Sequence, residues 1–220
     1  MRMAQHVAAW AKSGEPEPGF VPVEYVSFDN DESRECPYFD LEYIPPKDVR
    51  IKLEVRSLVP AIATSGGCCL FRTNSNNVTP WSFMLRVLSG VDKIRYYFGD
   101  SYSQFDSGDT RNAFHVYEID TKHGDVYKDG NLIGSSVMVY PSSMIGLTIG
   151  KRNGTGTNGL NYGFEMKRFT VVDENGNVLR EIVPYRDKNY NAFLFDGTKY
   201  YSVLQGSDLI GDVSVGPDKT

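Results

Sequence analysis

Two stretches of the chain combine aromatic, amide and carboxylate side chains in a way that suits the binding of a polar ligand. The first runs from Phe98 to Asn112 and the second from Lys151 to Gly159. Aromatic rings can stack on the faces of a sugar, and Asn, Asp and Gln can bond to its hydroxyl groups. The same composition is also ordinary in solvent-exposed loops. The residues that we expect to contact a ligand are Tyr102, Phe105, Asp109, Arg152, Asn153 and Asn158.

Two carboxylates, Glu118 and Asp120, are the sequence feature closest to a hydrolytic site. Retaining glycosidases use two carboxyl groups about 5–5.5 Å apart. Enzymes that place this catalytic pair on one strand carry the motif Glu-x-Asp-x-Glu. Here the next side chain on the same face after Asp120 is that of Lys122, so the second Glu of the motif, and with it the second catalytic carboxylate, is missing. We therefore assign Glu118 and Asp120 to a solvent-exposed strand face and predict no catalytic residue.

Neither the histidines nor the acidic loops form a recognisable chemical motif. The three histidines, His6, His115 and His123, stand beside no Cys or Ser in a nucleophile motif. We interpret His115 as a surface or hydrogen-bonded histidine. The acidic loops Asp29–Glu32 and Asp106–Asp109 lack the spacing of a recognised calcium motif. No metal site or cofactor is predicted, and calcium at these loops is the alternative.

Composition narrows the classes of partner. The formal net charge of −5 argues against a surface that tracks nucleic-acid phosphates, which needs clustered Lys and Arg. No stretch has the roughly 18 apolar residues of a membrane helix, and the first residues lack the apolar core of a signal peptide. The three cysteines, an odd number with a vicinal pair, suit neither a disulfide framework nor a zinc site. We read them as reduced core residues and expect no membrane or nucleic-acid partner.

From Phe20 onward, short segments rich in Val, Ile, Tyr and Phe are separated by turn residues, which is typical of an all-β domain. Val49–Arg56 alternates apolar and charged residues, so one face of this strand should lie in a core. Asp129-Gly130 between two such segments favours a tight primed hairpin turn. The pattern predicts about a dozen strands.

The first residues differ from this body. Met3, Val7 and Trp10 share one face of a possible helix, and Glu15–Gly19 reads as a stiff Pro-rich spacer. A helix this short is marginal in water by itself. We expect the apolar stripe Met3, Val7 and Trp10 to contact another chain, and the alternative is that it folds back onto its own sheet. The predicted parts are an N-terminal arm over 1–19, a β-sandwich over 20–204 and a C-terminal tail over 205–220.

Several segments resemble concanavalin-A-like or laminin-G-like jelly-roll domains of gut bacteria and their phages. They are Val23–Ser27, Tyr117–Asp120, Val126–Gly134, Met144–Gly150, Tyr162–Val171, Leu179–Lys188 and Ala192–Tyr201. The similarity spans Val21 to Tyr201 and departs from the family pattern at Asp29–Pro37. It implies an all-β, concanavalin-A-like jelly-roll β-sandwich with a short N-terminal helical or extended arm.

The resemblance also implies a function class. It favours a non-enzymatic phage virion protein, such as a capsid decoration, head-fibre or tail-associated module at the virion surface. The arm would then bind other virion chains or form a homo-oligomer, and the jelly roll would display a lectin-like surface for glycans or host adhesion. The alternative is a secreted, extracellular or cell-surface carbohydrate-binding domain of a gut bacterium. A glycoside hydrolase is the weaker alternative.

Overall fold

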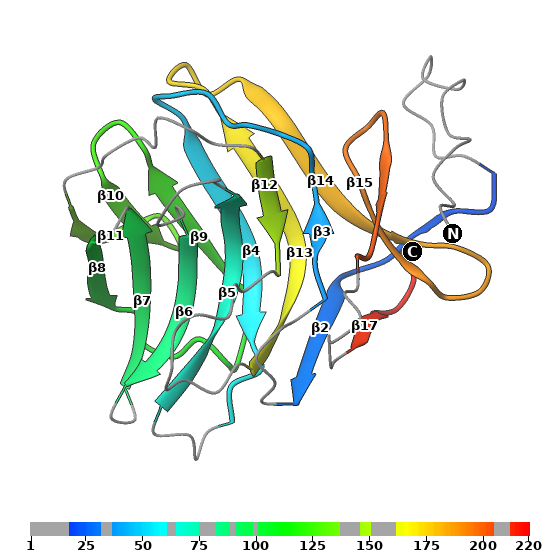
Figure 1. Cartoon of the computed structure of the whole chain (residues 1–220), viewed down its shortest axis with the longest axis horizontal. Coiled ribbons are helices and arrows are strands. Elements are labelled where there is room, and N and C mark those ends of the chain that lie inside the picture. Colours follow the sequence, from blue (N-terminus) through cyan, green and yellow to red (C-terminus); the bar gives the residue numbers. More distant parts are fainter. Residues whose placement is uncertain are drawn as a thin grey trace.

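The computed structural model describes residues 18–31, 37–60, 65–74, 82–88, 91–98, 101–136, 146–150, 162–204 and 212–220. These residues form strands in two antiparallel sheets (Figure 1), and they include no helix. The N-terminal stripe Met3, Val7 and Trp10 lies outside the described residues, so its contact with another chain stays a prediction. None of the described residues belongs to a helix long and apolar enough to cross a membrane.

The larger sheet has eleven strands. Eight follow one another in the order β11, β10, β9, β4, β13, β14, β15 and β16, while β1 pairs with β14, and β2 pairs with both β13 and β17. Their bounds are β1 Val21–Pro22, β2 Val26–Asp31, β4 Arg50–Ser57, β9 His115–Asp120, β10 Asp125–Lys128, β11 Asn131–Ser135, β13 Tyr162–Val172, β14 Val178–Arg186, β15 Ala192–Phe195, β16 Tyr200–Ser202 and β17 Asp212–Val215.

The smaller sheet has six strands in the order β3, β12, β5, β6, β7 and β8. Their bounds are β3 Phe39–Asp40, β5 Ser65–Asn74, β6 Ser82–Leu88, β7 Val91–Phe98, β8 Ser101–Asp106 and β12 Gly146–Ile149. Strand β8 forms one edge of this sheet, and its neighbour in the other layer is β11, the edge of the larger sheet.

One hydrophobic core fills the space between the sheets. Ile51, Leu53 and Val55 of β4 are fully buried, as their alternation with charged residues predicts. Phe71 of the smaller sheet meets Phe169 of the larger one with ring centroids 6.2 Å apart. The predicted all-β sandwich is therefore confirmed.

The predicted hairpin is also confirmed. Strands β10 and β11 pair antiparallel through Asp129 and Gly130, whose φ angles are +50° and +80°. Two consecutive residues with positive φ are the mark of the primed turn that Asp-Gly favours. The Asp129 carboxylate accepts a hydrogen bond from the Val116 amide at 2.9 Å, and His115 Nδ1 lies 2.7 Å from its second oxygen. This turn therefore also fastens the hairpin to β9.

Strand β13 is the branch point of the larger sheet. Along one edge it pairs with β4 from Phe164 to Val172. Its other edge pairs with β2 up to Met166 and with β14 from Phe169 onward. The sheet therefore continues from β13 in two directions, one through β2 and β17 and one through β14 to β16.

Two features of the structure differ from the sequence-based expectations. Much of the stretch Phe98–Asn112, whose composition is ordinary in solvent-exposed loops, forms the edge strand β8. This strand lacks the usual alternation of apolar and polar residues because Ser103, which lies on the same side of the strand as Phe105, is polar. The segment predicted as a C-terminal tail over 205–220 includes β17, which pairs with β2. The sandwich therefore includes residues beyond 204.

Candidate functional site

The outer face of the β7–β8 pair carries a row of polar and aromatic side chains. In the register of this pair, Lys93 lies opposite Asp106, and Arg95 lies opposite Gln104. The intervening residue Ile94 is fully buried in the core. Because side chains alternate between the faces of a strand, these two pairs lie on the face turned away from the core, together with Tyr102.

The aromatic ring of Tyr102 is the most exposed part of this row. The residue is 52% exposed, and the Arg95 guanidinium carbon lies 4.1 Å from the centre of its ring. Arg95 itself is only 9% exposed. At this distance the quadrupole of the aromatic ring attracts the guanidinium, and this attraction favours the observed position of the ring. Tyr102 is therefore displayed on a nearly buried support.

The same guanidinium orients Gln104. Its Nε and Nη2 atoms donate to Gln104 Oε1 at 3.0 and 2.7 Å. Since the carboxamide oxygen is bound to the arginine, its amino group must point away from the guanidinium, where it can donate two hydrogen bonds. Beyond it, Lys93 forms an ion pair with Asp106. The row thus offers a stacking ring, an oriented amide and a neutralised ion pair. We call Tyr102, Arg95, Gln104, Lys93 and Asp106 the β8 strip.

Of the predicted ligand residues, Phe105 has a structural role. It packs against the core, and a Cβ atom added to Gly134 would lie 2.0 Å from Phe105 Cδ1. The ring thus covers bare backbone of β11 and closes the gap between the sheet edges. Arg152, Asn153 and Asn158 lie outside the described residues.

Asp109 lies exposed in the loop after β8, and its carboxylate is used within that loop. Its Oδ1 accepts a hydrogen bond from the Arg111 amide at 2.8 Å, which is the main cause of the lowered pKa of Asp109. Lys128 Nζ donates to the carbonyl oxygens of Ser107 and Asp109 at 2.7 and 2.5 Å. The Asp109 side chain therefore stabilises the loop rather than extending the β8 strip.

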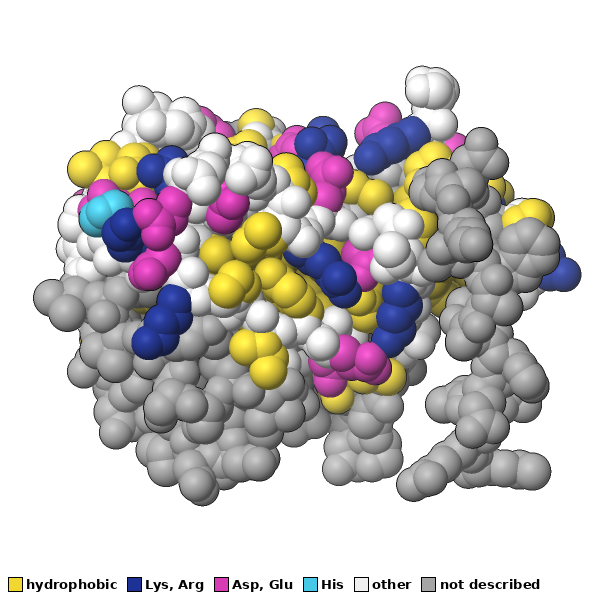
Figure 2. Space-filling model, turned by 90° about the horizontal axis from the view of Figure 1, so that it is seen from above, with side chains coloured by type: hydrophobic (Ala, Val, Ile, Leu, Met, Phe, Trp, Pro, Cys, Tyr) yellow, Lys and Arg dark blue, Asp and Glu magenta, His cyan; other side chains and the backbone are white. Residues whose placement is uncertain are grey.

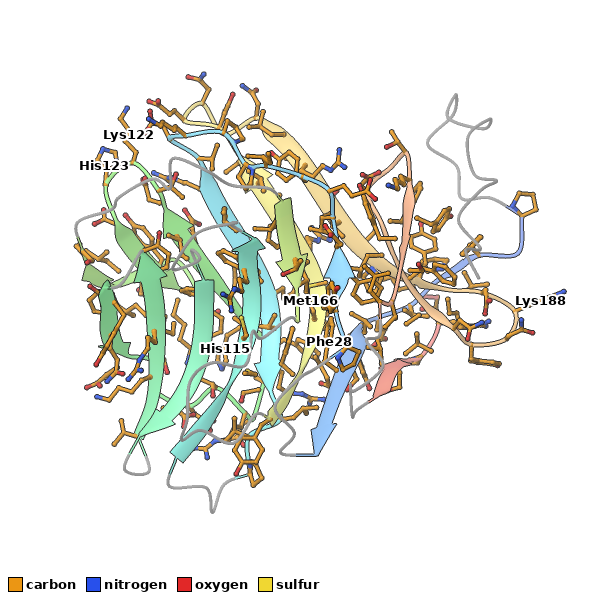
Figure 3. All side chains as sticks on the ribbon, viewed as in Figure 1. Phe28, His115, Lys122, His123, Met166 and Lys188 are labelled. Atoms are coloured by element: carbon orange, nitrogen blue, oxygen red, sulfur yellow. The ribbon has the colours of Figure 1, made fainter. Side chains whose placement is uncertain are left out.

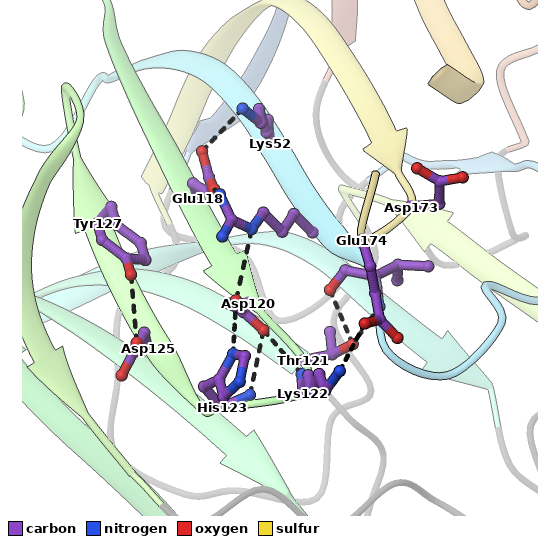
Figure 4. Close-up of polar contacts among 12 residues, drawn as sticks. Lys52, Glu118, Asp120, Thr121, Lys122, His123, Asp125, Tyr127, Asp173 and Glu174 are labelled. Atoms are coloured by element: carbon purple, nitrogen blue, oxygen red, sulfur yellow. Dashed lines mark hydrogen bonds and ion pairs between the residues drawn. The ribbon is translucent and has the colours of Figure 1, made fainter. Parts of the chain in front are cut away.

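The expectation that Asp120 lies on a solvent-exposed face is wrong. Asp120 is only 4% exposed, because the turn after β9 folds over it. Its carboxylate accepts hydrogen bonds from the amides of Lys122 and His123 at 2.9 and 3.1 Å and from His123 Nδ1 at 3.0 Å (Figure 4). Burial alone would raise the pKa of Asp120, but the hydrogen bonds from His123 and Lys122 outweigh it and lower the pKa.

Glu118 is half-buried beside it and is paired with two cations. Arg50 Nη1 and Lys52 Nζ lie 3.3 and 2.9 Å from its carboxylate oxygens, and Arg50 Nε lies 3.4 Å from Asp120. A glycosidase needs one carboxyl group that keeps its proton near neutral pH. The lowered pKa of Asp120 keeps that group ionised, so it is unsuited to proton donation.

Charges of both signs are interleaved on the face of the molecule seen in Figure 2. In the view of Figure 2, basic and acidic side chains alternate and form no large area of one sign. Lys122 and His123 lie in the turn between β9 and β10, at the upper left of Figure 3. Within the described part of the chain, no three His, Cys, Asp or Glu side chains are grouped so that they could hold a metal ion.

The sequence analysis selected Tyr102 as a candidate ligand residue but did not select Arg95 and Gln104, which lie beside it. These two residues are nine positions apart and meet only through the register of β7 and β8. The feature that could have revealed them is alternation across the turn between the two strands, with Arg95 and Gln104 each two residues from an aromatic residue.

Comparison with known proteins gives matches in structure alone. No family model and no curated protein matches the sequence. The solved structures similar to this chain include domains LG4-5 of the mouse laminin alpha1 chain, with 15% identity, a TM-score of 0.47, and coverage of 74% of this chain and 44% of that one. Alginate lyase AlyC3 in complex with dimannuronate has 14% identity, a TM-score of 0.45, and coverage of 66% and 73%. Carbohydrate-binding module CBM66 of Bacillus subtilis has 11% identity, a TM-score of 0.42, and coverage of 70% and 94%.

Proposed function

We propose that this chain is a carbohydrate-binding domain that holds a neutral glycan along the β8 strip. The observation that carries the proposal is the exposed Tyr102 ring, supported by the Arg95 guanidinium that also orients Gln104. A sugar ring needs an apolar surface for its face and fixed donors for its hydroxyl groups. The β8 strip supplies both without a further rearrangement of these side chains.

The strip also has a suitable direction and charge. Tyr102, Gln104 and Asp106 are alternate residues of one strand, so their side chains follow each other about 7 Å apart. An extended oligosaccharide could contact all three. Lys93 and Asp106 neutralise each other, and Arg95 is occupied by Gln104 and the Tyr102 ring. This balance favours a neutral sugar over a strongly anionic one.

The setting in which the domain acts is a further part of the proposal. A secreted or cell-surface carbohydrate-binding domain needs only the β8 strip, so we place it first. The phage virion role requires the N-terminal arm to bind another chain, and the residues of that arm lie outside the described ones.

Titration with a panel of neutral oligosaccharides tests the function. We expect Tyr102→Ala to lower the affinity for the bound glycan by about tenfold or more, as for an aromatic anchor in an interface. Gln104→Glu keeps the contact with Arg95 but removes the donating amino group, so it should also weaken binding. Val178→Ala, a change at another exposed apolar residue, is the matched control. Unaltered binding by Tyr102→Ala, with the thermal midpoint preserved, would contradict the proposal.

A further inference from the structure

Two successive hairpins of the larger sheet are joined by turns of the same sequence pattern, Asp-x-Asn-x-Asn. The first is Asp173–Asn177 between β13 and β14, and the second is Asp187–Asn191 between β14 and β15. In both turns the Asp Oδ1 accepts the amide hydrogens of the third and fifth residues at 2.8–2.9 Å. In both, the Asn side chain at the fifth position donates to the other carboxylate oxygen at 2.8 Å.

The fourth position is where the two turns differ. Gly176 has φ of +84° and Tyr190 has φ of +63°. Glycine is the usual residue there because a Cβ atom is unfavourable in the left-handed region, and a bulky residue with positive φ is an outlier. A Cβ atom at Gly176 would meet nothing within 4 Å. Glycine suits the first turn because of the positive φ at this position, and not because a side chain would clash there. The turn itself therefore does not account for Tyr190.

The Tyr190 side chain is displayed at the tip of its hairpin. It is 66% exposed, and the Arg186 guanidinium carbon lies 4.3 Å from the centre of its ring. Arg186 is held in turn by Asp218, to which its Nε and Nη2 atoms donate at 2.6 Å each. A cation that is itself fixed thus supports the ring from one side, as Arg95 supports Tyr102.

We propose that Tyr190 and the neighbouring tip residues form a second carbohydrate-contact site, for a neutral pyranose ring. The ligand class rests on the proposed function, while the location is new. An aromatic anchor of a protein interface is usually surrounded by residues that exclude water. Here the exposed neighbours are Lys188, Asn189 and Asn191, which suit a hydrated ligand with hydroxyl groups. Since Asp218 neutralises Arg186, an anionic ligand gains little from this support.

The two sites are far apart. Strand β8 lies at one end of the longest axis of the molecule, and the hairpin that carries Lys188 lies at the other (Figures 1 and 3). A single short oligosaccharide cannot bridge them, so each site is expected to bind its own sugar.

The deciding variant is Tyr190→Gly, which turns the second turn into a copy of the first. In titrations with the same neutral oligosaccharides, we expect the number of bound sugars per chain to fall from two to one. The thermal midpoint should stay the same or rise, because a left-handed residue is replaced by glycine. Tyr190→Phe, which keeps the ring, should retain both sites. Gly176→Tyr is the control for the backbone: it should lower the thermal midpoint and leave the two sites intact.

The outcomes separate this inference from the proposed function. If Tyr190→Gly binds as many sugars as the unmodified chain, the second site is refuted, whereas the function at the β8 strip stands if Tyr102→Ala removes a site. If Tyr102→Ala leaves binding unchanged but Tyr190→Gly abolishes it, the tip is confirmed and the β8 strip is refuted. Should Tyr190→Gly lower the thermal midpoint as well as binding, Tyr190→Asn replaces it, since Asn tolerates positive φ. Absence of any sugar binding by the unmodified chain overturns both.

Discussion

Phe105 illustrates how one residue type can suggest two roles from sequence. It stands in a polar stretch beside Tyr102, yet the strand turns the two rings to opposite faces. Tyr102 is exposed on the outer face, while Phe105 reaches across to the backbone of Gly134 in the other sheet. Composition identified the aromatic residues, and only the alternation of β8 decides which of them can meet a ligand.

The contact between Phe105 and Gly134 leads to a prediction about packing. In Gly134→Ala the new methyl group would lie 2.0 Å from Phe105 Cδ1, so the ring must move. We expect the free energy of unfolding to fall by ~1–3 kcal/mol, the usual cost of overpacking. Urea denaturation measures the change. A double variant with Phe105→Leu should lose less than the sum of the two single changes, and strict additivity would show that the two residues do not touch.

At the level of the elements, Asp120 holds the turn that joins β9 to β10. Its pKa is lowered because hydrogen bonds to the ionised carboxylate outweigh its burial. This stabilisation is complete above the pKa of an unfolded Asp, about 3.9, and is lost as the pH falls through the lower folded value.

We therefore expect Asp120→Asn to destabilise the protein at pH 7 by ~1–3 kcal/mol, the cost of impairing a buried hydrogen-bonded charge. The difference from the unmodified chain should shrink as the pH falls below about 4, where the carboxylate of the unfolded chain becomes protonated, and should be lost only below the lower pKa of the folded state. Urea unfolding at pH 7, 4 and 3 measures it, and Glu174→Gln, an exposed partner of Lys122, serves as control. A difference that stays constant over this range would mean that folding does not lower the pKa of Asp120.

How much of the structure was predictable depends on the range of the interaction. The Asp129-Gly130 turn and the buried face of Ile51 and Leu53 are local features, and both followed from the sequence. The burial of Asp120 requires a turn to fold over it, and the support of Tyr102 requires Arg95 from another strand. Such contacts depend on strand register, which short sequence patterns do not specify. For the candidate site, the sequence therefore indicated the ring of Tyr102 but not Arg95 and Gln104, the residues beside it.

On the scale of the whole molecule, the last described residues close the sandwich. Strand β17 pairs with β2, and beyond it the Gly216 amide donates to the Tyr25 carbonyl at 2.9 Å. The Lys219 amide donates to the Pro22 carbonyl at 2.9 Å. Val213 and Val215 of β17 pack against the core. Segments from the two ends of the described chain thus complete the same part of the sheet (Figure 1).

Ending the chain after residue 211 should therefore expose the edge of β2. We expect a lower thermal midpoint and self-association, because an unpaired strand edge can pair with another chain. Calorimetry and light scattering measure these effects. Asp218→Asn, which removes only the partner of Arg186, separates the loss of this ion pair from the loss of the strand. A truncated protein that stays monomeric with an unchanged midpoint would contradict a structural role for β17.

The branch at β13 has a consequence for how the chain reaches this structure. Residues paired across β4 and β13, such as Arg56 and Glu165, are 109 positions apart in the sequence. Closing so large a loop loses chain entropy before the two halves of the larger sheet can join. The hairpins β9–β10–β11 and β13–β14–β15 can form locally, but they join only when β4 meets β13. We expect refolding to be slow, on a scale of ~milliseconds to seconds, and stopped-flow measurements would detect a faster process. Until β4 pairs with β13, the apolar faces of both hairpins remain exposed to other molecules. The folding chain is therefore most prone to aggregation just before its middle strands pair.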